Sequence, residues 1–162
     1  MFHLHIVLLE PEIPQNTGNI ARTCAATCAS LHLIKPLGFS IDDKHMKRAG
    51  LDYWDSLDVH VYENIAEFYE KNPNANVYYF SKKGHRIYSE VAYPDEVYLL
   101  FGRESVGLPE DLLKAHEENC LRMPMKEGLR SLNLSNAVAI AAYEVLRQKD
   151  FPALEMKGHL GE

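Results

Sequence analysis

The stretch LRMPMKEGLRSLNLSNAVAIAAYEVLRQ, residues 121–148, decides how the rest of this chain is organised. Its apolar side chains recur at i, i+3, i+4, i+7, i+8 and i+11 from Leu134 to Val145, which is the period of an α-helix. The remaining face carries Ile140 and Tyr143, so the pattern predicts a helix over residues 134–147 that is buried on most sides. Such a helix lies either in a central core or between its own sheet and a second subunit. The small side chains favour the second arrangement.

A polar turn precedes this helix and contains four short polar residues, Ser131, Asn133, Ser135 and Asn136. Serine and asparagine are good N-caps because their side chains accept hydrogen bonds from the free amides of the first helical turn. One cap needs one such residue, however, and a glycine and two basic residues lie close by. We therefore interpret the turn as a functional loop as well as a helix cap.

Apolar runs alternate with helical patterns along the whole chain. The runs predict strands at residues 3–9, 31–35, 57–62, 77–81, 97–101 and 120–123, and the helical patterns predict helices at residues 20–29, 42–51, 65–71, 109–116 and 134–147. The strands are apolar throughout rather than at every second residue, which is typical of a mostly parallel sheet with helices on both faces. The predicted fold class is therefore α/β, and 162 residues with 46% hydrophobic content are expected to form a single domain.

Composition and charge exclude several classes of protein. The first residues lack a positive segment and reach an acidic loop after a short apolar run, so we expect no signal peptide, no membrane span and a cytoplasmic protein. Cys24, Cys28 and Cys120 form no C-x-x-C pair, which predicts reduced thiols and no metal site. A net charge of −6 argues against nonspecific coating of nucleic acid, although basic runs at residues 44–48 and 82–86 leave room for local phosphate contacts.

Three turns rich in glycine or asparagine follow predicted strands, at residues 14–19, 102–107 and 126–136. Ligands of an open parallel sheet bind beyond the carboxyl ends of its strands, so we expect these turns to converge there. None of them matches G-x-G-x-x-G or a P-loop, which argues against an ordinary dinucleotide or nucleoside-triphosphate site. In the first turn, Arg22 lies one helical turn from Asn19, an arrangement suited to an anion if it is more than a helix cap beside a surface arginine. In the second, Glu104 is either a functional carboxylate or an exposed loop residue.

Three motifs taken together, N-T-G-N-I-A-R at 16–22, F-G-R-E-S-V-G-L-P at 101–109 and R-M-P-M-x4-R-S-L-N-L-S-N-A-V at 122–138, resemble those of the SPOUT RNA methyltransferases. The match is to the SpoU branch, which methylates ribose 2′-hydroxyls. The resemblance implies an α/β sheet with a C-terminal trefoil knot that holds S-adenosylmethionine, and an obligate homodimer. It covers about the first 150 residues, so we expect 1–162 to be one methyltransferase domain without an auxiliary RNA-binding domain.

The opening E-P-E-I-P-x-N-T-G-N and the segment R-A-G-L-D-Y at 48–53 look most similar to family members that methylate the wobble nucleotide 34 of tRNA, a cytidine or carboxymethylaminomethyluridine. Two other functions remain open. One is a base methyltransferase of the same superfamily, and the other is a knotted RNA-binding protein without catalysis. The presence of all four residues that match the family's reaction centre argues against the last.

The resemblance also implies roles for individual residues. The cofactor pocket is expected to use Phe80, Ser81, Gly102, Arg103, Glu104, Gly107, Met123, Met125, Ser131 and Leu132. The reaction centre is expected at Arg22, Glu104, Ser131 and Asn133, and tRNA contacts at Asn16, Asn19 and Tyr143, the last on the helix where this family forms its dimer interface. The basic run at 44–48 adds Lys47 and Arg48 as expected phosphate contacts. A guanidinium keeps its proton up to a pH above ~12, so we interpret Arg22 as a cation that stabilises the developing alkoxide rather than as the general base.

Overall fold

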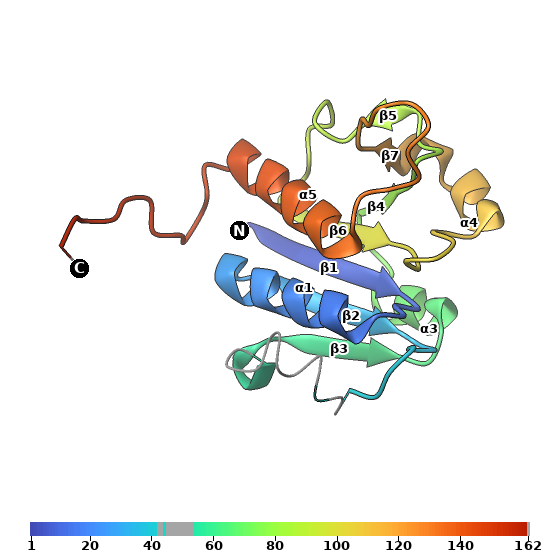
Figure 1. Cartoon of the computed structure of the whole chain (residues 1–162), viewed down its shortest axis with the longest axis horizontal. Helices are drawn as coiled ribbons and strands as arrows, with labels where there is room; N and C mark the ends of the chain where they lie inside the picture. Colours follow the sequence, from blue (N-terminus) through green and yellow to red (C-terminus); the bar gives the residue numbers. More distant parts are fainter. Residues whose placement is uncertain (42–43, 45–53, 162) are drawn as a thin grey trace.

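The computed structural model describes residues 1–41, 44 and 54–161. Within these residues, seven strands form one sheet in the order β3-β2-β1-β6-β4-β7-β5 (Figure 1). The strands are β1 (His3–Leu9), β2 (Ser30–Ile34), β3 (Val59–Tyr62), β4 (Val77–Phe80), β5 (Arg86–Ile87), β6 (Glu96–Phe101) and β7 (Cys120–Arg122). All the strand pairs in this sheet are parallel, which confirms the predicted α/β fold class.

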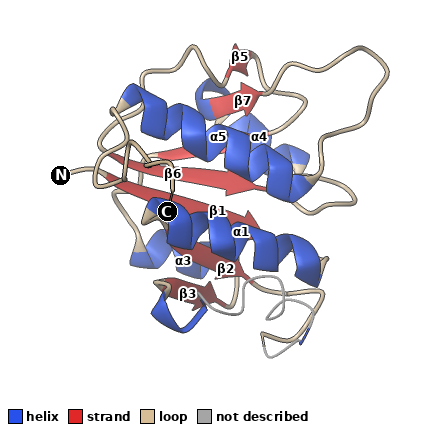
Figure 2. Cartoon of the chain, turned by 60° about the vertical axis from the view of Figure 1, so that its left-hand side comes forward, coloured by secondary structure: helices blue, strands red, loops and turns tan. Residues whose placement is uncertain are grey.

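Helices cover both faces of the sheet. They are α1 (Pro14–Thr27), α3 (Ile65–Lys71), α4 (Glu110–Ala115) and α5 (Leu134–Gln148), with short 3₁₀ turns η1 (Trp54–Ser56) and η2 (Glu117–Asn119). Figures 1 and 2 show α1 and α5 together on one face and α3 on the other. Two cores result. Leu4, Ile6 and Leu8 of β1 pack towards α1 and α5, while Val7 and Leu9 pack towards α3 and α4.

The predicted strands agree with the structure to within two residues at each end, and helix α3 agrees at both ends. The prediction was wrong for α1, because residues 14–19 are not a turn but the first part of the helix, with Pro14 at its start. Two-residue β5 and the 3₁₀ turns were not predicted. Apart from Lys44, the helix predicted at 42–51 lies outside the described residues.

The small side chains of helix α5 pack against other elements of the same chain. Ala141 and Ala142 are fully buried, and α5 contacts α1 and β6. Within the chain the small residues bring α5 close to α1, and the expected contact of this helix with a second subunit stays a prediction. The exposed strip of α5 instead presents Ile140 and Tyr143, at 43% and 47% exposure.

The three cysteines form no disulfide; Cys24 and Cys120 are buried and Cys28 is exposed, as expected for reduced thiols that are mostly packed. Burial raises the pKa of both Cys24 and Cys120, so these two thiols stay protonated. Among the helices of the described residues, none is long and apolar enough to cross a membrane.

Strand β7 lies between β4 and β5, although only residues 81–85 connect those two strands. This connection lies tightly against β7. The Ser81 amide donates to the Leu121 carbonyl at 3.0 Å, and the guanidinium of Arg122 donates to the Lys82 carbonyl. A Cβ on Gly84 would lie 2.6 Å from the carbonyl carbon of Leu121, so only glycine fits here. The chain that leaves β7 therefore passes closely by the segment that joins its two neighbours.

We predict that Gly84→Ala destabilises the fold. The added methyl group meets backbone atoms, which cannot rotate away, and overpacking of this kind costs about 1–3 kcal/mol. Urea denaturation followed by circular dichroism measures the free energy of unfolding. Gly158→Ala is the matched control, since a Cβ there has no neighbour within 4 Å. Equal stabilities for the two variants would show that the connection has room to move.

Candidate active site

A cavity of about 1120 Å³ opens at the carboxyl ends of β4, β6 and β7. The second and third predicted turns both line it, and the start of α1 contributes Asn16, so the expected convergence is confirmed. Its lining includes all ten residues expected in the cofactor pocket: Phe80, Ser81, Gly102, Arg103, Glu104, Gly107, Met123, Met125, Ser131 and Leu132. Their role in binding a cofactor stays a prediction, but the structure gathers them around one space.

The lining divides into an apolar part and a charged part. The rings of Phe80 and Phe101 stack with centroids 4.6 Å apart, and both residues are buried. Exposed cations, Lys82, Lys83, Arg103 and Arg130, belong to the same lining. An apolar wall with a few polar groups suits an adenine ring, and exposed cations suit phosphates of a polyanion.

The turn between β6 and α4 needs both of its glycines. The amide of Arg103 donates to the Gly107 carbonyl at 3.2 Å, and the amide of Gly107 donates back at 2.8 Å. Gly107 has φ +71°, a left-handed conformation that glycine adopts without strain. A Cβ on Gly102 would lie 2.2 Å from the Gly107 carbonyl carbon. The turn therefore presents tightly packed backbone, rather than side chains, at this wall of the cavity.

Glu104, inside this turn, caps helix α1. Its carboxylate accepts hydrogen bonds from the backbone amides of Glu12 and Ile13, at 2.8 and 2.9 Å, and from the side-chain amide of Asn16 at 3.3 Å. The amide of Ile13, at the N-cap position, is one of the free amides at the start of a helix, and Glu104 supplies its acceptor. A negative charge at a helix N-terminus also interacts favourably with the helix dipole.

Glu12, just before α1, in turn accepts hydrogen bonds from the turn that contains Glu104. Its carboxylate accepts from the amide and hydroxyl of Ser105, at 2.9 and 3.0 Å, and from the guanidinium of Arg103 at 3.3 Å. Hydrogen bonds from Ser105 and then from Arg103 lower the pKa of Glu12, so the carboxylate is ionised at neutral pH. The sequence analysis assigned no role to Glu12. Its signals were its place in the opening E-P-E-I-P-x-N-T-G-N and its position two residues before the proline that begins a helix.

Asn133 connects the third turn to the other two. Its side-chain oxygen Oδ1 accepts a hydrogen bond from the backbone amide of Asn136 at 3.2 Å and so caps helix α5. Its side-chain nitrogen donates to Asn16, which in turn donates to Glu104. The N-termini of α1 and α5 therefore meet at the cavity, joined by the series Asn133–Asn16–Glu104. The Glu104 carboxylate already occupies the N-terminus of α1, so the N-terminus of α5 is the one that provides a positive potential for an anionic group.

The predicted reaction centre divides in the structure. Glu104, Ser131 and Asn133 line the cavity, but Arg22 is an exposed residue of α1 and does not belong to the described lining. Because α1 begins at Pro14 rather than near residue 20, Arg22 lies about 12 Å along the helix from its N-terminus. The expectation that Arg22 lies beside a helix N-terminus was therefore wrong.

The residues predicted to contact tRNA are also dispersed. Asn16 is buried beneath the cavity, and Asn19 is exposed on α1. Tyr143 is exposed on α5 at the opposite end from the Asn133 cap. Lys47 and Arg48 lie outside the described residues.

Comparison with known proteins places this architecture in a family. The sequence profile of the SpoU rRNA Methylase family matches residues 3–143, and the chain belongs to that family. A Listeria innocua protein that is provisionally named a tRNA (cytidine(34)-2'-O)-methyltransferase is 58% identical over 153 residues, which cover 93% of this chain and 90% of that protein.

Two solved structures extend the comparison. One, described as giving structural insights into the 2-OH methylation of C/U34 on tRNA, is 48% identical with a TM-score of 0.87, and the match covers 92% of this chain and 97% of that one. The other, an AdoMet-bound rRNA methyltransferase from Sinorhizobium meliloti, is 25% identical with a TM-score of 0.81, over 90% of this chain and 56% of that one.

We predict that Glu104→Gln loosens the start of α1. The glutamine nitrogen cannot accept, so one of the two backbone amides now capped is left without a partner, at a cost of about 1–3 kcal/mol. Thermal or urea unfolding measures the loss. Glu110→Gln is the control, because among the described residues Glu110 forms an exposed ion pair with Lys83, and such pairs contribute little. A loss no larger than that of the control would mean that solvent replaces the Glu104 cap.

Proposed function

We propose that this protein transfers a methyl group from S-adenosylmethionine to the ribose 2′-hydroxyl of the wobble nucleotide 34 of tRNA, a cytidine or carboxymethylaminomethyluridine. The observation that carries the proposal is the meeting of three SpoU motif segments around one cavity at the carboxyl ends of the strands. The relatives support the choice of nucleotide, since one is named for cytidine 34 and another is described by C/U34 on tRNA.

The cavity fits S-adenosylmethionine in size and chemistry. Small-molecule sites of about 300–1,000 Å³ hold ligands of this kind, and this one is of comparable size. The stacked Phe80 and Phe101 suit the adenine, and the backbone of the turn at 102–107 approaches closely enough to select its edge. When bound, S-adenosylmethionine supplies an electrophilic methyl group on its sulfonium. The AdoMet-bound structure of a relative with the same fold supports this assignment.

The protein's task is then to align a ribose hydroxyl and to stabilise the charge that develops on its oxygen. Ser131 and Asn133 lie at the cavity near the N-terminus of α5, where hydrogen bonds and the helix dipole favour a negative oxygen. Glu104 has its carboxylate engaged by α1, so we assign it to positioning the turn rather than to proton transfer. The proton of the hydroxyl then passes to a substrate phosphate or to solvent.

A second copy of the chain completes the site in this proposal. Arg22 is exposed on α1 outside its own cavity, and the neighbouring helix α5 exposes the apolar Ile140 and Tyr143. A homodimer that covers these helices would bring Arg22 of one copy to the cavity of the other. The position of β7 between two strands joined by five residues supports a trefoil knot in each copy.

Transfer RNA is held, we infer, by the cations at the cavity rim and needs neither an auxiliary RNA-binding domain nor a metal. Lys82, Lys83 and Arg130 belong to the lining and are exposed, and the run at 44–48 adds further positive charge in the sequence. Each neutralised phosphate steepens the salt dependence of binding by roughly one unit of log–log slope. A tRNA substrate also places the protein in the cytoplasm.

The direct test is incubation of the protein with labelled S-adenosylmethionine and tRNA, followed by nuclease digestion. A label that appears in a nuclease-resistant 2′-O-methyl dinucleotide containing position 34 is the expected result. A label on a base would identify a base methyltransferase, and RNA binding without any label would identify an RNA-binding protein without catalysis. Either of these results would overturn the proposal.

We predict that Arg22→Ala loses turnover but keeps its cofactor. A group that stabilises charge only in the transition state contributes to rate, and its removal typically costs ~10²–10³ in rate. Calorimetry should show S-adenosylmethionine affinity within about threefold of wild type, while single-turnover assays show the loss. Arg22→Lys should recover little, because an ammonium lacks the planar fork of the guanidinium. Near-normal turnover in Arg22→Ala would remove Arg22 from the mechanism.

We predict that Ile140→Glu dissociates the dimer without unfolding the chain. Ile140 is 43% exposed in the isolated chain, so a charge there is tolerated by the fold but not by an obligate interface, which typically buries on the order of 2,000 Å² or more. Analytical ultracentrifugation gives the mass, and circular dichroism checks the fold. Leu160→Glu, on a fully exposed residue of the C-terminal segment, is the control. A wild-type monomer at micromolar concentration would contradict the homodimer.

A further inference from the structure

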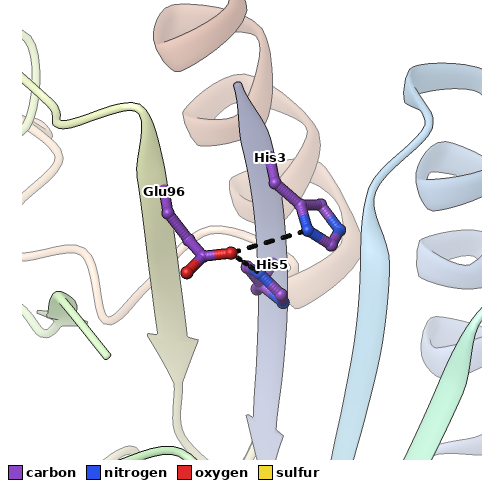
Figure 3. Close-up of side chains that lie close together, drawn as sticks. All are labelled: His3, His5 and Glu96. Carbon is purple, nitrogen blue, oxygen red and sulfur yellow. Dashed lines mark hydrogen bonds and ion pairs between the residues drawn. The ribbon is translucent and has the colours of Figure 1, made fainter. Parts of the chain in front are cut away.

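A group of titratable side chains lies at the amino ends of the central strands β1 and β6, whereas the cavity lies at the carboxyl ends of the strands. His3 and His5 are near the start of β1, and Glu96 begins the neighbouring strand β6, where it is the register partner of His3. Figure 3 shows the three side chains directed towards one another. The described lining of the cavity includes none of them, so the proposed methyl transfer gives them no role.

The three side chains bring their ligand atoms to one point. The Nδ1 of His3 lies 3.7 Å from Oε2 of Glu96, and the Nε2 of His5 lies 3.4 Å from the same oxygen. All three atoms lie within 4.8 Å of one another. A tetrahedral Zn²⁺ with bonds of about 2.0–2.1 Å separates its ligand atoms by about 3.3–3.4 Å. The two measured separations are therefore close to the edges of such a coordination shell.

A hydrogen-bond series fixes which nitrogen of His3 carries its proton. The Nε2 of His3 lies 2.7 Å from the hydroxyl of Ser30, and that hydroxyl donates to the carboxylate of Asp58 at 2.6 Å. The hydrogen bond from Ser30 lowers the pKa of Asp58, which keeps the carboxylate an acceptor. The hydroxyl proton is committed to Asp58, so Ser30 can only accept from His3. Neutral His3 therefore carries its proton on Nε2 and directs the lone pair of Nδ1 at Glu96.

His5 is oriented in the same manner from the buried side. Its Nδ1 lies 2.9 Å from Nε2 of His32, whose Nδ1 lies 2.8 Å from the hydroxyl of Tyr62. The side chain of His5 is only 7% exposed, so these contacts hold its ring in place. In metal sites the second nitrogen of a ligating histidine is usually hydrogen-bonded in this way, and the partner fixes the ring. Both histidines here have such a partner.

We propose that His3, His5 and Glu96 bind a divalent first-row transition-metal ion of the Zn²⁺ type, with solvent in the remaining position. Two imidazoles and one carboxylate are ligands that Zn²⁺ takes in open sites. Without a cation, the Nδ1 lone pair of His3 faces a carboxylate oxygen, which is repulsive. A bound ion would connect β1 to β6, and the exposure of His3 and Glu96, at 40% and 60%, leaves it a path from solvent. Hard cations such as Mg²⁺ prefer oxygen ligands and should not compete.

The test uses the wild-type chain of residues 1–162, freed of metal by a chelator and dialysed at pH 7.5. Titration with Zn²⁺ in a calorimeter should give one site per chain, and Co²⁺ in its place should give the visible d–d absorption of a tetrahedral ion. At a hundredfold excess over Kd, Zn²⁺ should raise Tm by about 5–10 °C. Mg²⁺ should do none of this.

Three variants and one control decide whether these residues hold the ion. His3→Ala and Glu96→Gln, at partly exposed positions, should fold and lose Zn²⁺ binding at this site. Ser30→Ala should weaken it about 10- to 100-fold, because it removes the partner that orients His3. His159→Ala, on an exposed residue of the C-terminal segment, should bind as wild type does.

Two results would overturn the proposal: a wild-type protein that shows no Zn²⁺-dependent change in heat, absorption or Tm, or Zn²⁺ binding that survives in both His3→Ala and Glu96→Gln. The first would mean that a proton on His3, rather than a metal, neutralises the contact with Glu96. Methyl transfer should not depend on the metal, because the site and the cavity lie at opposite edges of the sheet. Failure of one proposal is therefore distinguishable from failure of the other.

Discussion

The site depends on the Glu104 carboxylate at the start of α1. A helix leaves its first amides without partners, and here one of them, the amide of Ile13 at the N-cap position, needs an acceptor from elsewhere in the chain. Glu104 supplies it from 91 residues away, and Glu12 returns the interaction to the turn that carries Glu104. The start of α1 and the turn at 102–107 therefore hold each other in place. Asn16 and Asn133 extend the same hydrogen-bond network to the start of α5. The residues that begin the two helices are therefore the residues that shape the cavity.

This long-range cap explains where the sequence was informative and where it was misleading. The strands could be predicted because parallel strands are buried on both faces, and their apolar runs are unbroken. The start of α1 could not. The polar run Asn16–Asn19 has the composition of a cap, whereas the real acceptor lies in a distant turn. The pocket residues were predictable only as three separate motifs in order, and the opening motif that contains Glu12 did not indicate that its carboxylate binds Ser105.

Helix α5 shows a second limit of sequence patterns. Small residues at helical spacing indicate close approach, but they do not say to what. In the structure Ala141 and Ala142 face the chain's own α1 and sheet, and the larger Ile140 and Tyr143 are left outside. The same pattern would have served a subunit interface equally well. What distinguishes the two is the position of α1, whose buried Ile20, Ala21 and Cys24 share one core with Ala141 and Ala142.

The carboxyl and amino ends of the strands differ in how strongly packing restricts the residue at each position. At the carboxyl ends of the strands, backbone segments pack so closely that a Cβ has no space at Gly102 or Gly84. At the amino edge, β1, β2 and β6 begin side by side and no such closure is required, so polar side chains can occupy register positions there without disturbing the cavity. His3, His5 and Glu96 use that freedom. Because β1 is central to the sheet and Glu96 begins its neighbour β6, a cation held there would connect the starts of two paired strands.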